Sequence, residues 1–141
     1  MNDEERLEEL EKVLDTLTEM TGDHVILVEG NKDVAALKSV GIEGDVFCVQ
    51  VGGGPVKAAE YVWRSGKKAI ILTDWDRRGG SLAHDLRDNL SSLGVGYDDK
   101  IRSDLAFLTR PYSSLVRSLK CLQTTFIVSH HCEGTSPVAM L

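Results

Sequence analysis

The segment AIILTDWDRRGG, residues 69–80, is the part of the sequence that decides the fold. Four apolar residues and a threonine lead into Asp74 and Asp76, which are followed by two arginines and two glycines. A short apolar run bounded by turn residues is typical of a strand covered on both faces, as in a parallel sheet. Because side chains alternate along an extended chain, we expect both carboxylates on one side of the strand end and Trp75 on the other.

Similar apolar runs recur along the chain, and helical patterns separate them. We predict strands over residues 24–30, 45–51, 68–74 and, more briefly, 95–98. Apolar residues at three-and-four spacing predict helices over residues 3–20, 34–40, 56–65, 82–93, 101–108 and 115–122. Strands joined by single helices form βαβ units, so the sequence predicts an α/β fold with a Rossmann-like, mostly parallel four-stranded sheet and helices on both faces.

Composition narrows the class of protein. The 141 residues fit a single domain, and 42% hydrophobic with 27% charged residues is ordinary for a globular protein. The acidic N-terminus and the lack of an apolar run of about 20 residues argue against a signal peptide or a membrane partner. Three widely spaced cysteines fit a reducing compartment, so we expect a cytoplasmic protein. The net charge of −6 requires that any nucleic-acid contact be local or bridged by metal.

Three carboxylates stand where predicted strands end. Glu29 closes the first strand, and Asp74 and Asp76 close the third. In open parallel sheets the ligand site lies outside the carboxyl ends of the strands. If the first and third strands are neighbours, the three carboxylates would repel one another unless a cation or a proton intervened. Oxygen ligands of this kind suit Mg²⁺ or Mn²⁺.

These residues also resemble a known family. VEGNKD at residues 28–33, followed later by DWDRRG at residues 74–79, is similar to the toprim domain of topoisomerases, bacterial-type primases and several nucleases. The likeness covers about residues 24–100 and is in particular to small stand-alone toprim proteins of archaea and some bacteria. It implies Mg²⁺ held by Asp74 and Asp76, with Glu29 as a metal ligand or as the general acid/base in phosphodiester chemistry. It divides the chain into an N-terminal amphipathic helix (1–22), a toprim domain (23–100) and a C-terminal helical extension and tail (101–141).

Further residues beside these motifs are candidates for contacts with phosphate. The basic side chains next to the proposed site form a local patch that consists of Lys32, Arg77 and Arg78. The GGGP turn offers the backbone amides of Gly53 and Gly54 near a helix N-terminus, although such glycines often only let the chain reverse. We assign supporting roles to Gly30, Asp33 and Gly79; Asp33 has the alternative of favouring the positive end of its own helix.

The sequence therefore predicts a Mg²⁺-dependent protein that acts on RNA or DNA phosphodiester bonds, as a nuclease or a processing component. The first alternative is a non-catalytic module that binds nucleic acid or a nucleotide through metal and recruits a protein partner; whether the chain forms a homodimer stays open. A second alternative is a haloacid-dehalogenase-like phosphatase with Asp74 as nucleophile and Asp98 and Asp99 downstream. An Asp-x-Asp pair can also be a turn with a helix N-cap. We interpret the histidines and cysteines of the tail as too poorly spaced for zinc.

Overall fold

The computed structural model describes residues 1–110 and 112–120. A parallel sheet in the strand order β2-β1-β3-β4 forms its centre, and β1 and β3 are the inner pair. The strands are β1 (His24–Val28), β2 (Val46–Cys48), β3 (Lys68–Ile71) and β4 (Tyr97–Asp98). This arrangement confirms the predicted α/β fold with its parallel four-stranded sheet.

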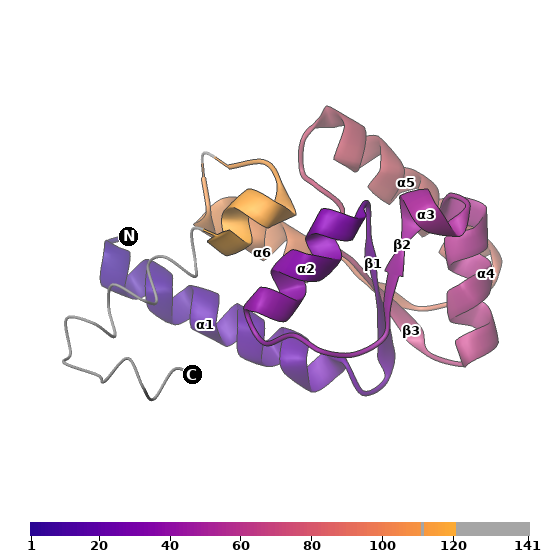
Figure 1. Cartoon of the computed structure of the whole chain (residues 1–141), viewed down its shortest axis with the longest axis horizontal. Coiled ribbons are helices and arrows are strands. Elements are labelled where there is room, and N and C mark those ends of the chain that lie inside the picture. Colours follow the sequence, from indigo (N-terminus) through magenta and orange to yellow (C-terminus); the bar gives the residue numbers. More distant parts are fainter. Residues whose placement is uncertain (111, 121–141) are drawn as a thin grey trace.

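Apart from α3, the helices follow the predicted order along the chain (Figure 1). They are α1 (Asp3–Met20), α2 (Asn31–Ser39), α3 (Val49–Gly52), α4 (Pro55–Ser65), α5 (Arg77–Ser92) and α6 (Lys100–Leu108), with a further short helix over residues 115–120. The expected first helix agrees residue for residue, and the Asn2 side chain accepts a hydrogen bond from the Glu5 backbone N–H at 2.9 Å, as a helix N-cap does. The part of the expected last helix and tail beyond Lys120 lies outside the described residues.

Alternating strand residues bury the sheet on both faces. Ile26, Val28, Ile70 and Leu72 face a cluster built with α1, α2, α6 and the helix over 115–120. Val25, Leu27, Ala69 and Ile71 face the opposite cluster, which contains residues of α4 and α5. All eight of these side chains have zero exposure, including Leu72, which directly follows the last residue of β3. Continuous apolar runs in the sequence are thus explained by strands covered on both sides.

The prediction of a strand over residues 45–51 was wrong in its second half. The strand ends at Cys48, and residues 49–52 form the short helix α3. Val49 is buried against the α4 and α5 side of the sheet, whereas Val51 is 69% exposed. The backbone N–H of Gln50 donates to the Glu29 carbonyl at 3.0 Å, which turns the chain across the end of β1. The apolar alternation Val49, Val51 therefore reflects one buried and one exposed residue of a helical turn.

Helix α1 carries the net charge of the protein. Residues 3–20 hold eight acidic and two basic side chains, so the remaining residues hold fourteen of each sign. The helix ends shortly before β1 begins and packs against α6, away from the edge where β1 ends and α2 starts (Figure 1). The chain outside α1 is therefore neutral overall, and the acidity is set apart from the carboxyl edge of the sheet.

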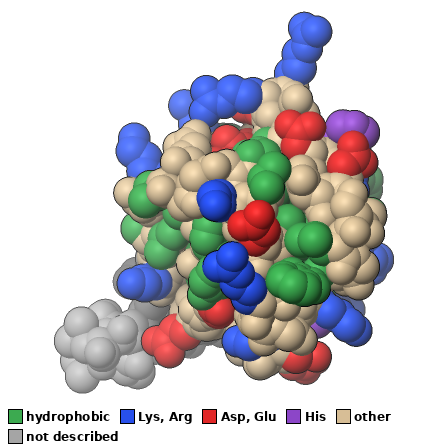
Figure 2. Space-filling model, turned by 90° about the vertical axis from the view of Figure 1, so that its right-hand side faces the viewer, with side chains coloured by type: hydrophobic (Ala, Val, Ile, Leu, Met, Phe, Trp, Pro, Cys, Tyr) green, Lys and Arg blue, Asp and Glu red, His purple; other side chains and the backbone are tan. Residues whose placement is uncertain are grey.

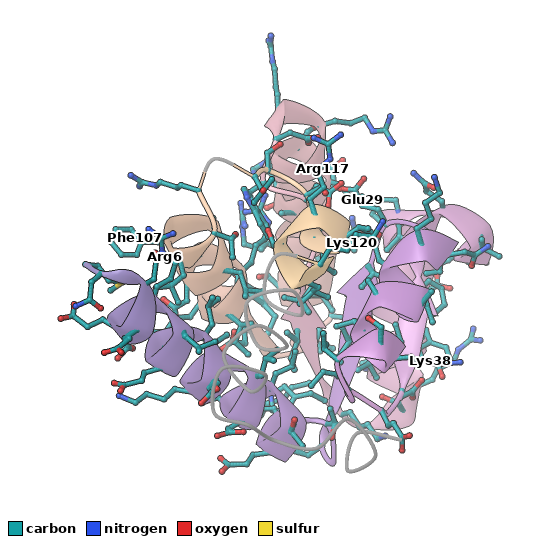
Figure 3. The ribbon with its side chains drawn as sticks, turned by 60° about the vertical axis from the view of Figure 1, so that its left-hand side comes forward. Arg6, Glu29, Lys38, Phe107, Arg117 and Lys120 are labelled. Atoms are coloured by element: carbon teal, nitrogen blue, oxygen red, sulfur yellow. The ribbon has the colours of Figure 1, made fainter. Side chains whose placement is uncertain are left out.

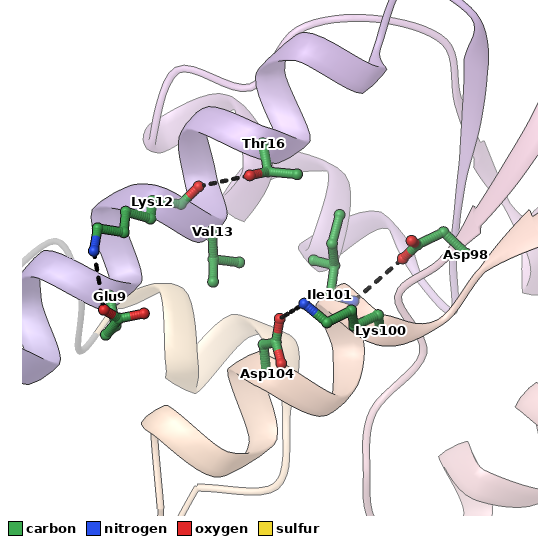
Figure 4. A pocket seen from close by; sticks show the side chains of 8 residues that line it. All are labelled: Glu9, Lys12, Val13, Thr16, Asp98, Lys100, Ile101 and Asp104. Atoms are coloured by element: carbon green, nitrogen blue, oxygen red, sulfur yellow. Dashed lines mark hydrogen bonds and ion pairs between the residues drawn. The ribbon is translucent and has the colours of Figure 1, made fainter.

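A shallow pocket between α1 and α6 has its charges already paired. Lys12 contacts Glu9 at 3.1 Å, and Lys100 contacts Asp104 at 3.6 Å (Figure 4). The Asp98 side chain accepts a hydrogen bond from the Ile101 backbone N–H at the start of α6. The first ion pair lies within α1, and the second ion pair and the Asp98 hydrogen bond lie at α6, so none of them crosses between the two helices. Within residues 1–110 and 112–120, no helix is both long enough and apolar enough to cross a membrane.

Candidate functional site at the ends of β1 and β3

The pairing of β1 with β3 brings the two sequence motifs together. Leu27 lies opposite Ile71 in the ladder, and the Leu72 N–H donates to the Leu27 carbonyl at 2.9 Å. Two residues further along, the Glu29 side chain meets the chain that leaves β3: its Oε1 accepts a hydrogen bond from the Asp74 N–H at 3.0 Å. The adjacency that the sequence left open is therefore present.

Glu29 is a buried carboxyl group with only 6% of its surface exposed. Burial is the main reason that its pKa is raised, and the charges of Asp74 and Asp76 raise the pKa further. The Asp74 N–H and the Arg78 guanidinium, whose Nη2 lies 3.9 Å from Oε2, act in the opposite direction. A carboxyl group whose pKa is raised can hold a proton nearer neutral pH, which suits proton transfer.

Asp74 and Asp76 both use one carboxylate oxygen to accept a backbone hydrogen bond. Asp76 Oδ1 accepts from the Gly79 N–H at 2.7 Å, so Asp76 is the N-cap of α5. Asp74 Oδ1 accepts from the Leu115 N–H at 2.8 Å, across 41 positions of sequence. The alternative interpretation of the pair as a capped turn is thus correct for Asp76. In the part of the chain that the structure describes, no three Asp, Glu, His or Cys side chains converge as a ready-made metal site.

Gly79 allows the loop that carries Asp74 and Asp76, the Asp-x-Asp loop, to pack closely against Glu29. A Cβ atom at this position would lie 1.8 Å from the Asp74 carbonyl oxygen and 2.8 Å from Glu29 Oε1. The Gly79 carbonyl also accepts a hydrogen bond from the buried Thr73 hydroxyl at 2.9 Å. Any side chain here would push α5 away from the strand ends, so the glycine is required by close packing of backbone on backbone.

Asp33 and Gly30 stabilise the turn that follows Glu29. Asp33 Oδ2 accepts a hydrogen bond from the Gly30 N–H at 2.9 Å and is 6% exposed. Burial raises the pKa of Asp33, and the backbone N–H groups of Gly30 and Glu29 oppose that rise. These contacts agree with the alternative in which Asp33 supports the beginning of its own helix.

The three basic side chains of the predicted patch are all exposed at helix starts. Lys32 is in the first turn of α2, and Arg77 and Arg78 open α5. Arg78 is directed at the site through its contact with Glu29, while its side chain remains 80% exposed. It can therefore contact a bound anion without losing its position beside the carboxyl group.

The glycine turn, the GGGP segment at residues 52–55, uses its backbone N–H groups differently from the Asp-x-Asp loop. The backbone N–H groups of Gly53 and Gly54 both donate to the Val49 carbonyl, so they close α3 and do not point at open space. The side chains that flank the turn are the exposed Val51 and Val56. Figure 2 views the side of the molecule that carries α3 and α4, where hydrophobic side chains reach the surface among basic and acidic ones. This geometry favours the alternative in which the glycines only reverse the chain.

Arg102 and the segment 112–120 also contact the site, although no pattern in the sequence around them predicted this. Arg102 donates from Nε to the Thr73 carbonyl at 2.9 Å and from Nη2 to the Asp74 carbonyl at 2.7 Å. Its pKa is lowered, chiefly by burial and then by the nearby charge of Arg87. Segment 112–120 reaches the same loop through Leu115. Both contacts depend on how α6 folds back onto the sheet, which periodicity along the chain does not reveal.

Comparison with known proteins agrees with this geometry. The family model described as the Toprim domain matches residues 24–104. The chain belongs to the Toprim domain family. Toprim domains are typically metal-binding domains of enzymes that process nucleic acids, and Mg²⁺ is their usual metal. The matched region ends before residues 112–120, so the segment that binds Asp74 lies outside it.

Small archaeal proteins are among the relatives of this Toprim protein. It is 38% identical over 115 residues to "UPF0292 protein Mbar_A0484" of Methanosarcina barkeri, which covers 81% of this chain and 80% of the relative. It is 31% identical over 122 residues to "UPF0292 protein MJ1624" of Methanocaldococcus jannaschii, covering 86% and 93%. Among solved structures, a "putative protein from Aquifex aeolicus" matches with a TM-score of 0.63 and 27% identity over 70% of this chain and 89% of that one. The expected similarity to small stand-alone toprim proteins is confirmed.

The phosphatase alternative loses its structural basis. The Asp-x-Asp pair follows β3, with β1 and β2 before it in the chain. Asp98 accepts the Ile101 N–H hydrogen bond, and Asp99 pairs with Arg87 at 3.3 Å. The downstream acidic pair that this chemistry would need is therefore engaged elsewhere, at the start of α6.

Proposed function

We propose that this Toprim protein acts on phosphodiester bonds of RNA or DNA in a divalent-metal-dependent reaction, as a nuclease or a processing component. The observation that carries the proposal is the buried Glu29 carboxyl, in contact with the Asp74 backbone and close to the charges of Asp74 and Asp76 at the ends of two adjacent parallel strands. Burying a carboxyl group costs free energy, so a buried carboxyl beside other acidic groups indicates a functional site.

The donor chemistry fits Mg²⁺ or Mn²⁺. Mg²⁺ usually takes one or two carboxylates together with water and substrate phosphate, so three converging side chains are not required. Each aspartate accepts a hydrogen bond from a backbone N–H at its Oδ1, and each carboxylate has a second oxygen. Asp74 and Asp76 would hold the ion, and Glu29 beside them would act as the general acid/base rather than as an essential ligand. When bound, the ion neutralises charge on the non-bridging phosphate oxygens.

The side chains of the protein have separate tasks in this reaction. Glu29, whose pKa is raised by burial, exchanges a proton with the leaving or attacking oxygen. Arg78, and beyond it Arg77 and Lys32, bind phosphate groups of the substrate by charge-assisted hydrogen bonds. Arg102 holds the carbonyls of Thr73 and Asp74 and so fixes the loop that carries the metal ligands.

The test compares the wild type with Asp74→Asn and Glu29→Gln in a Mg²⁺ and Mn²⁺ titration. Structured RNA, single-stranded DNA and duplex DNA are assayed for cleavage, and metal affinity is measured by calorimetry. We expect Asp74→Asn to lose metal affinity and cleavage together. Glu29→Gln should keep most of the metal affinity and lose about a hundredfold or more in rate, as for a general acid/base. Glu19→Gln, an exposed carboxylate on α1, is the control that should change neither.

A second candidate is a non-catalytic module that binds nucleic acid and recruits a protein partner. The observation in its favour is that both aspartates already serve the backbone as hydrogen-bond acceptors. In that case metal-dependent binding would be present and lost in Asp74→Asn, with no cleavage of any substrate by the wild type. Equal loss of metal binding and activity in Glu29→Gln would contradict the acid/base role.

A further inference from the structure

Residues 112–120 form a clasp over the Asp-x-Asp loop. The Leu115 N–H donates to Asp74 Oδ1 at 2.8 Å, and the Trp75 N–H donates to the Ser113 carbonyl at 2.9 Å. The Trp75 indole N–H donates to the Tyr112 carbonyl. Three hydrogen bonds thus tie two consecutive residues of the loop to this clasp, which lies beyond the region that the Toprim family model matches.

The clasp is anchored in the core as well as on the loop. Leu115 and Leu119 have 0% and 1% exposure and belong to the cluster that includes α1 and α6. The buried Ser118 hydroxyl lies 2.8 Å from the Thr109 hydroxyl. Because one side of the short helix is fixed in the core, its opposite side has a defined direction relative to Asp74.

The outward side of the clasp is cationic. Arg117 and Lys120, three residues apart and therefore on one side of a helix, are exposed, whereas Ser118 and Leu119 are buried. Arg117 is two residues past Leu115, an advance of about 3 Å along a helix axis. Figure 3 shows Arg117 and Glu29 at the same end of the molecule, and Arg6 and Phe107 at a different end.

We infer that Arg117 is a further phosphate-binding residue, which contacts the backbone of a nucleic acid held at the Asp-x-Asp site. The inference rests on the proposed function and extends its substrate surface from the starts of α2 and α5 to the clasp. A guanidinium group presents several N–H donors in a plane that matches two phosphate oxygens. The Leu115 hydrogen bond to Asp74 holds the backbone that carries Arg117 beside the proposed metal ligands.

The test uses fluorescein-labelled single-stranded DNA, duplex DNA and structured RNA in Mg²⁺, with affinity measured by anisotropy over a range of KCl concentrations. We expect Arg117→Gln to bind at least about fivefold more weakly than the wild type, as the loss of one charge-assisted hydrogen bond requires. The slope of log affinity against log salt should fall by about one. Arg117→Lys should keep the slope, because it keeps the charge.

Arg6→Gln is the matched control, since it removes the same charge from an exposed site on α1. Its affinity and salt slope should equal those of the wild type, and the melting temperature of Arg117→Gln should be unchanged because that side chain is exposed. If Arg117→Gln binds like the wild type and Arg6→Gln, the inference is overturned, while loss of binding in Asp74→Asn still supports the proposed function. If the wild type binds none of the three nucleic acids, the proposed function is overturned and the inference with it.

Discussion

The Asp-x-Asp loop and the glycine turn were both candidates for contacts with phosphate, but they differ in where their hydrogen-bond partners come from. The Asp-x-Asp loop is held by groups far away in sequence: Glu29 before it, and Arg102 and Leu115 after it. The glycine turn satisfies its own amides on the Val49 carbonyl, which is at most five residues away. A loop that receives contacts from three separate elements is preorganised, and preorganised polar groups are what a reaction site needs.

The surroundings of the two turns differ in the same sense. Arg77 and Arg78 directly follow the Asp-x-Asp loop, and a buried carboxyl group lies beneath it. The glycine turn is flanked by Val51 and Val56, which are 69% and 55% exposed. Backbone amides alone are weak evidence for phosphate binding. The charge of the neighbouring side chains, and their need for hydrogen-bond partners, distinguish a phosphate-binding site from a turn that only reverses the chain.

The largest effect is expected from Gly79→Ala in the Asp-x-Asp loop. The new Cβ would lie 1.8 Å from a backbone oxygen, which no side-chain rotation relieves. We expect a loss of at least about 3 kcal/mol in the free energy of unfolding, at the upper end of overpacking costs. Urea denaturation measures this. Gly80→Ala is the matched control, with its nearest atom, an Arg102 nitrogen, at 3.9 Å. It should gain roughly 0.5–1 kcal/mol as a helical Gly→Ala change; equal stability of the two variants would contradict the close approach.

Gly54→Ala probes the glycine turn, where the effect should be intermediate. Gly54 has φ +98° and ψ −175°, a conformation that is accessible almost only to glycine, and no atom would contact the added Cβ within 4 Å. The cost is therefore backbone strain of about 1–3 kcal/mol. Metal affinity, measured by calorimetry, should equal that of the wild type. A drop in metal or nucleic-acid affinity would return the glycine turn to the site.

Asp76 separates its capping role from its proposed role as a metal ligand. Asp76→Ala should cost about 1 kcal/mol in unfolding free energy, because the Gly79 N–H loses its acceptor. Asp76→Ser keeps an N-cap hydroxyl, so its stability should equal that of the wild type. Both variants should lose metal affinity to a similar extent. Full metal affinity in Asp76→Ser would leave this residue with a capping function alone.

The smallest effect is a change in the pH dependence of stability. The pKa of Glu29 is raised in the folded protein, so its contribution to stability is complete below the ordinary pKa of glutamate. It is lost as pH rises through the folded value, because ionisation is easier in the unfolded chain. Glu29→Gln should therefore melt at a higher temperature relative to the wild type at pH 7 than at pH 4, in EDTA. Saturating Mg²⁺ should reduce the difference at pH 7; a constant difference at both pH values would contradict the raised pKa.

Much of the fold followed from the sequence because its determinants are local. The apolar run before Thr73 and the one before Glu29 gave two strands, and their order in a parallel sheet placed both motifs at one edge. The strand expected over 45–51 failed because the apolar-polar-apolar order Val49-Gln50-Val51 is typical of a strand, in which both valines would share one face. In the helical turn that forms instead, the two valines point in different directions, so Val49 is buried and Val51 is exposed.

The candidate site could be predicted only in its acidic half. Glu29 directly follows β1, and Asp74 and Asp76 lie three and five residues past the end of β3, at the edge of the sheet where topology places a ligand site. Arg102 is in the first turn of a helix that starts 26 residues after Asp74, and its sequence neighbours carry no sign of a contact with the loop. The N–H groups that orient Asp74 are brought to it only by the tertiary fold. The tertiary fold therefore also determines which carboxylate oxygen of Asp74 is left to bind a ligand.

The concentration of negative charge on α1 gives the protein a permanent electrical asymmetry. Eight carboxylates lie along one 18-residue helix, and the neutral remainder carries Arg77 and Arg78 at the start of α5, at the carboxyl edge of the sheet. In the electric field of a polyanion, the protein experiences a torque that turns α1 away from the polyanion. The protein is therefore oriented before the two surfaces touch. The torque acts within a Debye length, about 8 Å at physiological ionic strength, and fades as salt is added.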